Sequence, residues 1–294
     1  MVDEVEAAGG QAGARTRALA LLRVSHPFPS VLNGAVTGVL ASVAGAGPTR
    51  ALALTVAMIA LQGSIGALND LCDVDRDRVA GRAKPIPAGL VGRQAAWLIV
   101  GAGLSIGLSL SAAAGPATLG VALAGTALGY LYDLRLKTTP WAWLPFALGI
   151  PLLPVYAWIG AVDRLPVGFA VLVPLAILAG AAIALINGLV DVERDKVAGS
   201  VTPAVWLGRS GGWLVAAILE ALVSIGAEGS LLAASAPFGA VAGVAAGSLV
   251  LGLGLTFSRA SQPARRERGW QMGAIGFGVL AAAWAIGYAG RGLL

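Results

Sequence analysis

The chain has 294 residues, of which 57% are hydrophobic and only 12% are charged, and its mean hydropathy is +0.81. Soluble proteins carry about 25% charged residues, so this composition excludes a soluble globule, a coiled coil and a disordered chain and indicates a polytopic membrane protein. The net charge of +5 includes no dense basic patch or tail, and no nucleic-acid partner is expected. One cysteine and one histidine exclude a disulfide within the chain, a thiolate metal cluster and a paired-imidazole metal site.

Residues 1–25 are polar and lack a long apolar core, which predicts a cytoplasmic N-terminal segment and not a signal peptide. Residues 26–294 are predicted to form one transmembrane domain. A spanning helix needs about 20 mostly apolar residues. Nine stretches approach this requirement and predict an all-α bundle of nine transmembrane helices: 27–47, 51–71, 94–114, 116–132, 141–161, 166–190, 211–233, 237–257 and 270–290. Their many Gly and Ala residues predict close helix packing.

Basic residues distinguish the two ends of the predicted bundle. Seventeen of the 20 lysines and arginines fall in loops on one side, whereas Arg50, Arg164 and Arg291 fall on the other. Because cytoplasmic loops are enriched in Lys and Arg, the first side is predicted to be cytoplasmic. The expected location is a bacterial cell membrane, with the N-terminus and the active-site loops in the cytoplasm.

Two acidic segments, each at the cytoplasmic end of an even-numbered span, repeat each other. Residues 69–81 read NDLCDVDRDRVAG and residues 187–199 read NGLVDVERDKVAG. At an offset of 118 they share Asn, Asp, a second acid, Arg, Asp, a base and Val-Ala-Gly, and each is followed by a proline at the same distance. An internal repeat of this kind predicts two structurally equivalent helix ends.

A helical wheel gives both segments the same polar face, since helical residues lie about 100° apart. In the first segment the face holds Asn69, Asp70, Asp73 and Asp77, and in the second it holds Asn187, Asp191 and Asp195. Asp75 and Glu193 fall off the face. The wheel therefore predicts that each helix presents carboxylates and an amide to the bundle interior.

Facing carboxylates raise one another's pKa, and divalent cations relieve that repulsion. Oxygen ligands without His or Cys suit Mg²⁺, which commonly binds one or two carboxylates together with substrate phosphates. Candidate donors to phosphate oxygens are the nearby bases Arg78, Arg82, Lys84, Lys137 and Lys196. The alternative interpretation is a solvated, mixed-charge loop cap, which the matching register of the two segments disfavours.

The sequence Asn69-Asp70-x-x-Asp73-x-x-x-Asp77 resembles the first Asp-rich motif of the UbiA superfamily of intramembrane prenyltransferases. Asp191-x-x-x-Asp195 resembles the second motif. The resemblance covers roughly residues 23–290 and implies nine helices, with both motifs on the cytoplasmic side after helices two and six. It further implies Mg²⁺-dependent chemistry on an isoprenyl diphosphate. Two Mg²⁺ ions would bridge the diphosphate, held by Asn69, Asp70, Asp73, Asp77, Asp191 and Asp195, and Lys84 would contact diphosphate oxygens.

Members of this superfamily often carry a Tyr-x-x-x-Lys motif in the loop after helix four. This chain has Tyr132 followed by Lys137, one residue further along, or by Arg135, and the resemblance leaves open which base contacts the diphosphate. Tyr132 is expected to wall the site, and Asp73 or Asp191 to deprotonate the acceptor. Asn33, a polar residue in the first span, is predicted to face the interior, where it contacts substrate or forms an interhelical hydrogen bond.

The predicted function is transfer of an isoprenyl group, through an allylic carbocation, to a small-molecule acceptor inside the membrane. An aromatic or polycyclic acceptor is expected because aromatic residues lie near the predicted pocket. A membrane terpene cyclase would use the same metal–diphosphate site without an acceptor. A cation-coupled or proton-coupled transporter is a third reading, suggested by the repeat and the acids; it is disfavoured because the acids lie at one membrane face and not at the midplane.

Overall fold

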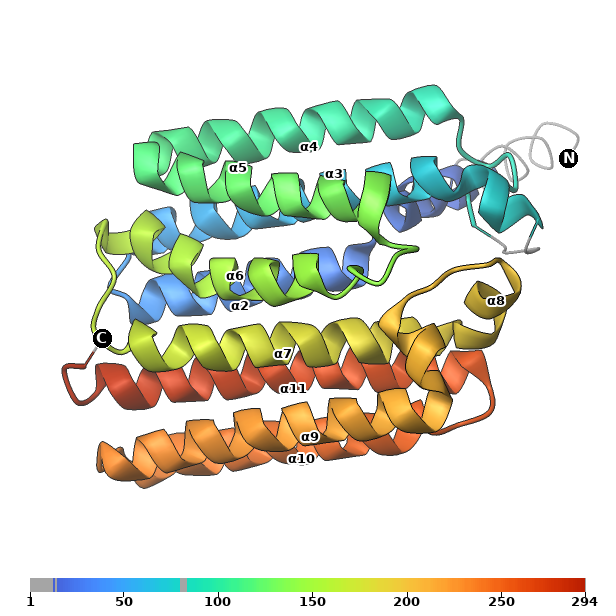
Figure 1. Cartoon of the computed structure of the whole chain (residues 1–294). Helices are drawn as coiled ribbons and strands as arrows, with labels where there is room; N and C mark the ends of the chain where they lie inside the picture. The colour runs from blue at the N-terminus through green and yellow to red at the C-terminus, as the bar shows by residue number, and fades with distance from the viewer. Residues whose placement is uncertain (1–12, 14, 80–83, 294) are drawn as a thin grey trace, which may run out of the picture.

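The computed structural model describes residues 13, 15–79 and 84–293, and every regular element in those residues is helical. Figure 1 shows long helices lying side by side, with the short α8 at one end of the bundle. The elements are α2 (Pro27–Val43), α3 (Pro48–Val79), α4 (Arg93–Ala114), α5 (Pro116–Leu131), the π-helical turn η1 (Tyr132–Leu136), α6 (Leu144–Val162), α7 (Phe169–Val190), α8 (Val192–Val197), α9 (Pro203–Ala233), α10 (Phe238–Ser258) and α11 (Pro263–Ala289).

Eight of the described helices are long and apolar enough to cross a bilayer, and α2, with 17 residues, is a shorter apolar helix. The predicted all-α membrane bundle is confirmed, and these elements correspond in order to the nine predicted spans. Residues 1–12 and 14 of the predicted N-terminal segment lie outside the described residues, and residues 15–24 are helical. The boundary between this segment and the membrane domain stays a prediction.

The second span extends further than its apolar stretch indicates. We predicted residues 51–71, whereas α3 runs without interruption from Pro48 to Val79 and includes residues 69–79 of the first acidic segment. Ion pairs at i,i+3 spacing, Arg76 with Asp73 and Arg78 with Asp75, support this polar extension. The described part of the first acidic segment, residues 69–79, is therefore part of a continuous helix.

The second acidic segment is built differently, because the helix breaks at Asp191. This residue has φ −119° and ψ 22°, and it separates α7 from α8. Arg266 of α11 is 1% exposed and donates from Nε and Nη2 to the carbonyl of Val190, at 3.1 and 2.8 Å. The same guanidinium binds both carboxylate oxygens of Glu193. Arg266 thus stabilises the end of α7, and Glu193, which the wheel placed off the polar face, serves this contact.

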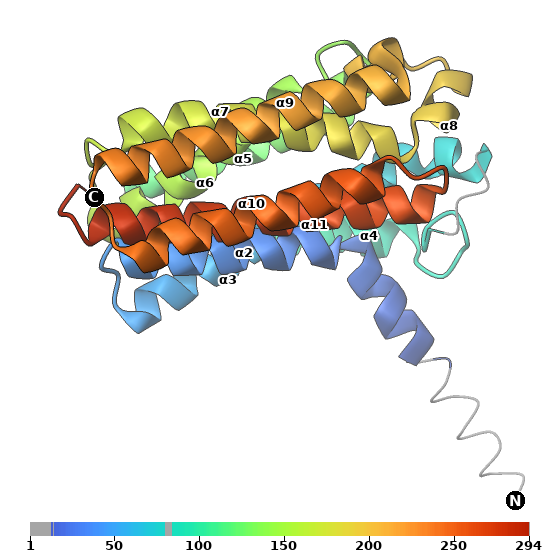
Figure 2. The ribbon, with the colours of Figure 1, turned by 90° about the horizontal axis from the view of Figure 1, so that it is seen from below.

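Small residues allow the backbones of α10 and α11 to approach closely, as predicted. A Cβ atom on Gly254 would lie 2.8 Å from the carbonyl oxygen of Gly269 and 3.0 Å from the backbone nitrogen of Gly273. Such contacts exclude any larger residue without a shift of the helices. Figure 2 shows α10 and α11 adjacent along their lengths.

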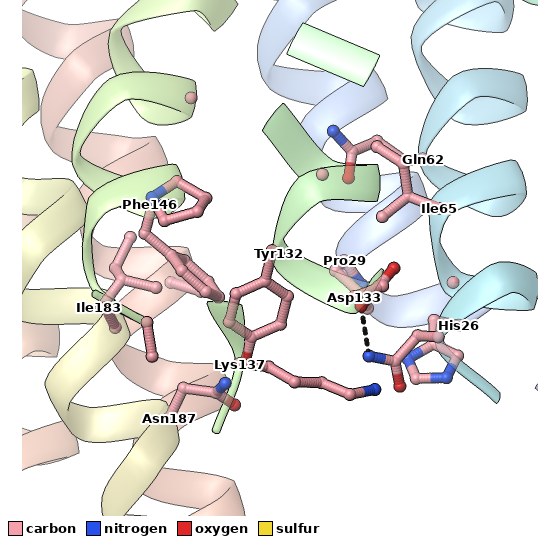
Figure 3. A pocket seen from close by; sticks show the side chains of 18 of the residues that line it. His26, Pro29, Gln62, Ile65, Tyr132, Asp133, Lys137, Phe146, Ile183 and Asn187 are labelled. Carbon is pink, nitrogen blue, oxygen red and sulfur yellow. Dashed lines mark hydrogen bonds between the residues drawn. The ribbon is translucent and has the colours of Figure 1, made fainter. Parts of the chain in front are cut away.

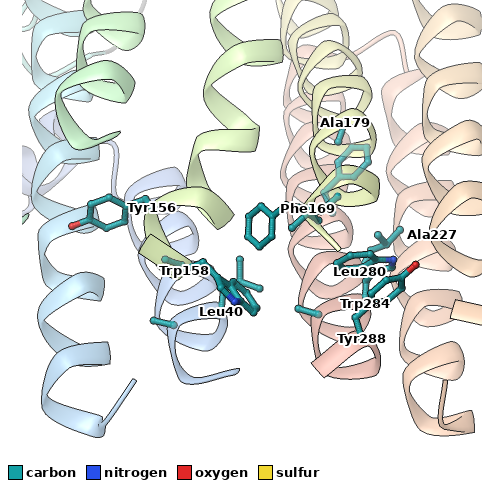
Figure 4. Close-up of a cluster of buried hydrophobic side chains, with 14 of the residues drawn as sticks. Leu40, Tyr156, Trp158, Phe169, Ala179, Ala227, Leu280, Trp284 and Tyr288 are labelled. Carbon is teal, nitrogen blue, oxygen red and sulfur yellow. The ribbon is translucent and has the colours of Figure 1, made fainter. Parts of the chain in front are cut away.

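Buried aromatic side chains fill the end of the bundle remote from the acidic segments (Figure 4). Trp158 packs edge-on against Phe169 with ring centroids 5.4 Å apart, and Trp284 stacks on Tyr288 at 4.0 Å. The Ser111 hydroxyl donates to the carbonyl of Gly107 at 2.7 Å and shares a hydrogen bond of 2.8 Å with the hydroxyl of Tyr156. This packing fills the end of the bundle opposite to the acidic segments.

Candidate active site

A cavity of about 760 Å³ lies between the helices and reaches the acidic segments. Residues of α2, α3, α5, η1, α6, α7, α8, α9 and α11 line it, so nearly the whole bundle contributes to one space. Its volume is that of a pocket for a small organic ligand. Figure 3 shows part of the lining, with side chains from η1, α3 and α7 pointing toward one another.

Both acidic segments contribute side chains to this cavity. Asn69 and Asp73 line it from α3, Asn187 from α7, Asp191 from the break after α7 and Asp195 from α8. Residues 118 positions apart in the sequence therefore meet across one space. The bases that also line it are Arg76, Lys84, Lys137 and Arg194.

Two of these bases form a matched pair that the sequence analysis did not select. Arg76 Nη1 lies 3.7 Å from Asp73 Oδ1, and Arg194 Nη1 lies 3.0 Å from Asp191 Oδ1. Arg76 and Arg194 occupy the same position in the repeat, three residues after equivalent aspartates. The repeat could have identified both arginines, because a base three residues after an acid lies on the same helical face.

Lys84 binds two carboxylates of the first segment at once. Its Nζ lies 2.9 Å from Asp70 Oδ1 and 2.9 Å from Asp77 Oδ2. Burial disfavours the charged form of Lys84, but Asp70 and Asp77 outweigh that effect and raise the pKa of its ammonium above the ordinary value. Asp70 also contacts His26 Nε2 at 3.0 Å. Asp70 and Asp77 are 2% and 0% exposed and lie behind the cavity lining, whereas Lys84 and His26 reach it.

The π-helical turn η1 decides which base of the 132–137 loop enters the cavity. The amide of Lys137 donates to the carbonyl of Tyr132 at 3.0 Å, an i→i+5 bond that accommodates an additional residue in the turn. Lys137 Nζ then lies 2.7 Å from Asp73 Oδ1, while Arg135 is exposed. Tyr132 lines the cavity with its ring edge-on to Phe146, at a centroid distance of 5.2 Å.

Other residues that we predicted to bind phosphate do not line the cavity. Arg78, Arg135 and Lys196 are exposed and do not line it, and Arg82 lies outside the described residues. Asn33 does line it. His26, the chain's single histidine, lines the cavity and binds Asp70.

Asp133, which sequence reasoning missed, is a carboxylate at the cavity surface. It is 4% exposed, and Asn69 Nδ2 donates to its Oδ1 at 2.6 Å, the bond drawn in Figure 3. Its position directly after Tyr132, as the lone acid in an otherwise basic loop, was the available signal.

The carboxylates and amides at the cavity suit Mg²⁺, because they supply oxygen ligands of the kind that a hard cation prefers. Among the residues that the structure describes, no three His, Cys, Asp or Glu side chains are grouped closely enough to hold one ion. Asp73 and Asp191 instead contact Lys137 and Arg194, whose positive charges neutralise them. Ion binding therefore requires these bases to turn away from the aspartates.

Comparison with known proteins agrees with this geometry. Residues 31–276 match the UbiA prenyltransferase family. The chain belongs to the UbiA prenyltransferase family. This membership favours an enzyme over the transporter considered from the sequence.

Two curated UbiA relatives illustrate the similarity. The chain is 30% identical over 198 residues to the chloroplastic chlorophyll synthase of Arabidopsis thaliana, covering 63% of this chain and 51% of that one. It is 29% identical over 212 residues to the digeranylgeranylglyceryl phosphate synthase of Pyrococcus abyssi, covering 70% and 75%. The chain thus spans about half the length of the plant chlorophyll synthases that it matches.

Solved UbiA homologues share the fold. One from Aeropyrum pernix K1 superimposes with a TM-score of 0.73 at 18% identity, covering 88% of this chain and 97% of that one. Another, from Archaeoglobus fulgidus and bound to GPP and Mg²⁺, gives a TM-score of 0.69 at 20% identity, covering 89% and 99%.

Proposed function

We propose that this UbiA protein transfers an isoprenyl group from an isoprenyl diphosphate to a small-molecule acceptor, in a reaction that depends on Mg²⁺. The observation that carries the proposal is the meeting of both acidic segments and four bases at one end of a large cavity between membrane-spanning helices. Such a site holds a diphosphate at its charged end and an apolar chain between the helices. The GPP-bound and Mg²⁺-bound homologue supports the same assignment.

The ligands proposed for two Mg²⁺ ions are the polar residues of the two acidic segments. Asn69, Asp73, Asp191 and Asp195 already line the cavity, and Asp70 and Asp77 lie behind it against Lys84. When bound, Mg²⁺ supplies Lewis-acid stabilisation of the charge that develops on the diphosphate. Lys137, Arg76 and Arg194 then exchange their aspartate partners for phosphate oxygens, to which they donate charge-assisted hydrogen bonds.

Residues of the chain stabilise both charges that form in the reaction, the negative charge on the diphosphate and the positive charge on the allylic carbon. The bond between the allylic carbon and the diphosphate oxygen breaks, and its electron pair leaves with the diphosphate, which Lys84 and Lys137 stabilise. The aromatic faces of Tyr132 and Phe146 stabilise the allylic cation by about 0.5–2 kcal/mol each. The acceptor forms a bond to this carbon and loses a proton to Asp73 or Asp191. Apolar helices exclude water from the cation.

The test compares aspartates inside and outside the cavity. Purified protein in lipid receives Mg²⁺, geranylgeranyl diphosphate and a panel of acceptors, and diphosphate release and prenylated products are measured. Asp73→Ala and Asp191→Ala are each expected to reduce turnover by at least about 100-fold. Asp75→Ala is the matched control, because Asp75 belongs to the same segment but is 88% exposed.

Normal product formation by both cavity variants would contradict the proposed diphosphate site. Release of diphosphate with formation of a hydrocarbon or terpene alcohol, and no transfer to any acceptor, would assign the site to a terpene cyclase instead. The proposed location is a cell membrane with the charged end of the cavity in the cytoplasm, which the positive-inside distribution supports. Cysteine accessibility in intact cells tests this orientation.

A further inference from the structure

Beyond its charged end the cavity is mostly apolar, but one side carries three polar side chains among its apolar ones; we call this side the polar wall and the opposite side the apolar wall. On the polar wall, α2 and α3 contribute Asn33 and Gln62 among apolar residues such as Leu61 and Ile65, and η1 contributes Asp133. On the apolar wall, α6 and α7 contribute Phe146 and Ile183. Figure 3 shows Gln62 and Asp133 on one side of the space, with Phe146 and Ile183 on the other. Two substrates of different polarity therefore have separate surfaces on which to lie.

Asp133 has hydrogen-bonding capacity that the protein does not use. Asn69 donates to Oδ1, but Oδ2 is buried and has no hydrogen-bond partner among the residues that the structure describes. Leaving a buried acceptor unpaired is unfavourable. A ligand that donates a hydrogen bond to Oδ2 would remove that penalty.

Two amides continue the polar wall deeper into the bundle. Gln62 lies two helical turns before Asn69, which places it about 10 Å deeper along α3. Among the described residues, the hydrogen-bond partner of its Nε2 is the weakly accepting sulfur of Met58, at 3.8 Å. Asn33 lines both the main cavity and an adjoining apolar chamber of about 100 Å³, and its side chain forms no hydrogen bond within the described ranges.

We propose that this polar wall binds the acceptor, and that the acceptor carries a neutral hydroxyl group that donates to Asp133 Oδ2. The proposal rests on the proposed prenyl transfer and names the chemical class of its second substrate. As a carboxylate, Asp133 accepts hydrogen bonds and repels another anion, so a carboxylate or phosphate on the acceptor would lie away from it. The amides of Gln62 and Asn33 bind further polar groups of the acceptor, and the prenyl tail lies along the apolar wall.

The first arm of the test varies the acceptor. Full-length protein in lipid, with Mg²⁺ and geranylgeranyl diphosphate, receives 1-naphthol, its methyl ether or 1-naphthoic acid, and in parallel 1-O-octadecylglycerol or its dimethyl ether. Prenylated product is expected from the two hydroxyl compounds and from none of the others. Product from 1-naphthoic acid at an equal or greater rate would overturn the assignment of a hydroxyl acceptor.

The second arm of the test substitutes residues of the polar wall. Gln62→Leu and Asn33→Leu are each expected to raise KM for the hydroxyl compound about tenfold and to leave KM for geranylgeranyl diphosphate unchanged, which also shows that the variants fold. Thr55→Val and Thr37→Val are the matched controls, since these hydroxyls bond backbone carbonyls of the same helices and do not line the cavity. Asp133 is left intact because its replacement would also release Asn69.

The outcomes separate this inference from the function on which it depends. An increase in KM for the diphosphate, with KM for the acceptor unchanged, would assign the amides to the prenyl substrate and overturn the inference alone. Diphosphate release by wild-type protein without prenylation of any hydroxyl compound would also overturn the inference and leave the proposed diphosphate site standing. Absence of Mg²⁺-dependent diphosphate release from wild-type protein would contradict the proposed function, and the inference with it.

Discussion

Lys137 and Arg135 offer a residue-scale test, because η1 separates two bases that lie two positions apart in the chain. Lys137 reaches Asp73 inside the cavity, whereas Arg135 is exposed. We predict that Lys137→Ala lowers diphosphate release about 100-fold, as expected for loss of one donor to a developing negative charge. Arg135→Ala is expected to stay within twofold of wild type. Steady-state measurement of diphosphate release at saturating Mg²⁺ checks both, and an equal loss in the two variants would show that Arg135 also reaches the substrate.

At the scale of the helix pair, the contact between α10 and α11 depends on the absence of side chains at a few positions. Gly254→Val would place atoms against the backbone of Gly269, and overpacking of this kind costs about 1–3 kcal/mol. We predict a lower melting temperature in detergent for this variant. Gly252→Val is the control in the same helix, because a Cβ atom there meets nothing within 4 Å. Equal melting temperatures for the two variants would contradict the close approach of α10 and α11.

Local sequence patterns predict some features of the helices and miss others. The wheel placed Asn69 and Asp73 together correctly, because α3 is a continuous helix and local periodicity describes it. The break at Asp191 depends on Arg266, 75 positions later, and no local pattern contains that contact. Likewise, the choice of Lys137 over Arg135 depends on one backbone hydrogen bond, and the withdrawal of Asp70 and Asp77 from the cavity depends on Lys84.

For the whole molecule, the ion pairs at the cavity predict that Mg²⁺ and diphosphate bind cooperatively. Mg²⁺ alone must displace Lys137 and Arg194 from Asp73 and Asp191 and leaves those bases without partners, whereas a diphosphate supplies new partners for them. We predict that Mg²⁺ alone barely changes the melting temperature. Mg²⁺ with a non-reactive thiolo analogue of geranylgeranyl diphosphate should raise it by about 5 °C. Simple additivity of the two separate shifts would contradict this coupling, and addition of EDTA should reverse the combined effect.

The length of α3 determines the depth at which this chemistry takes place. Its 32 residues extend for about 48 Å, well beyond a hydrocarbon layer about 30 Å thick. The apolar part, Pro48 to Leu68, is sufficient to cross that layer, so Asp73 and Asp77 lie at the depth of the headgroups, buried inside the bundle. This depth suits the proposed substrate, because a lipid-soluble diphosphate within one leaflet would hold its charged group at the level of the phospholipid phosphates and of these carboxylates. In the proposed reaction the released diphosphate would enter water directly, while the prenylated product would stay in the bilayer.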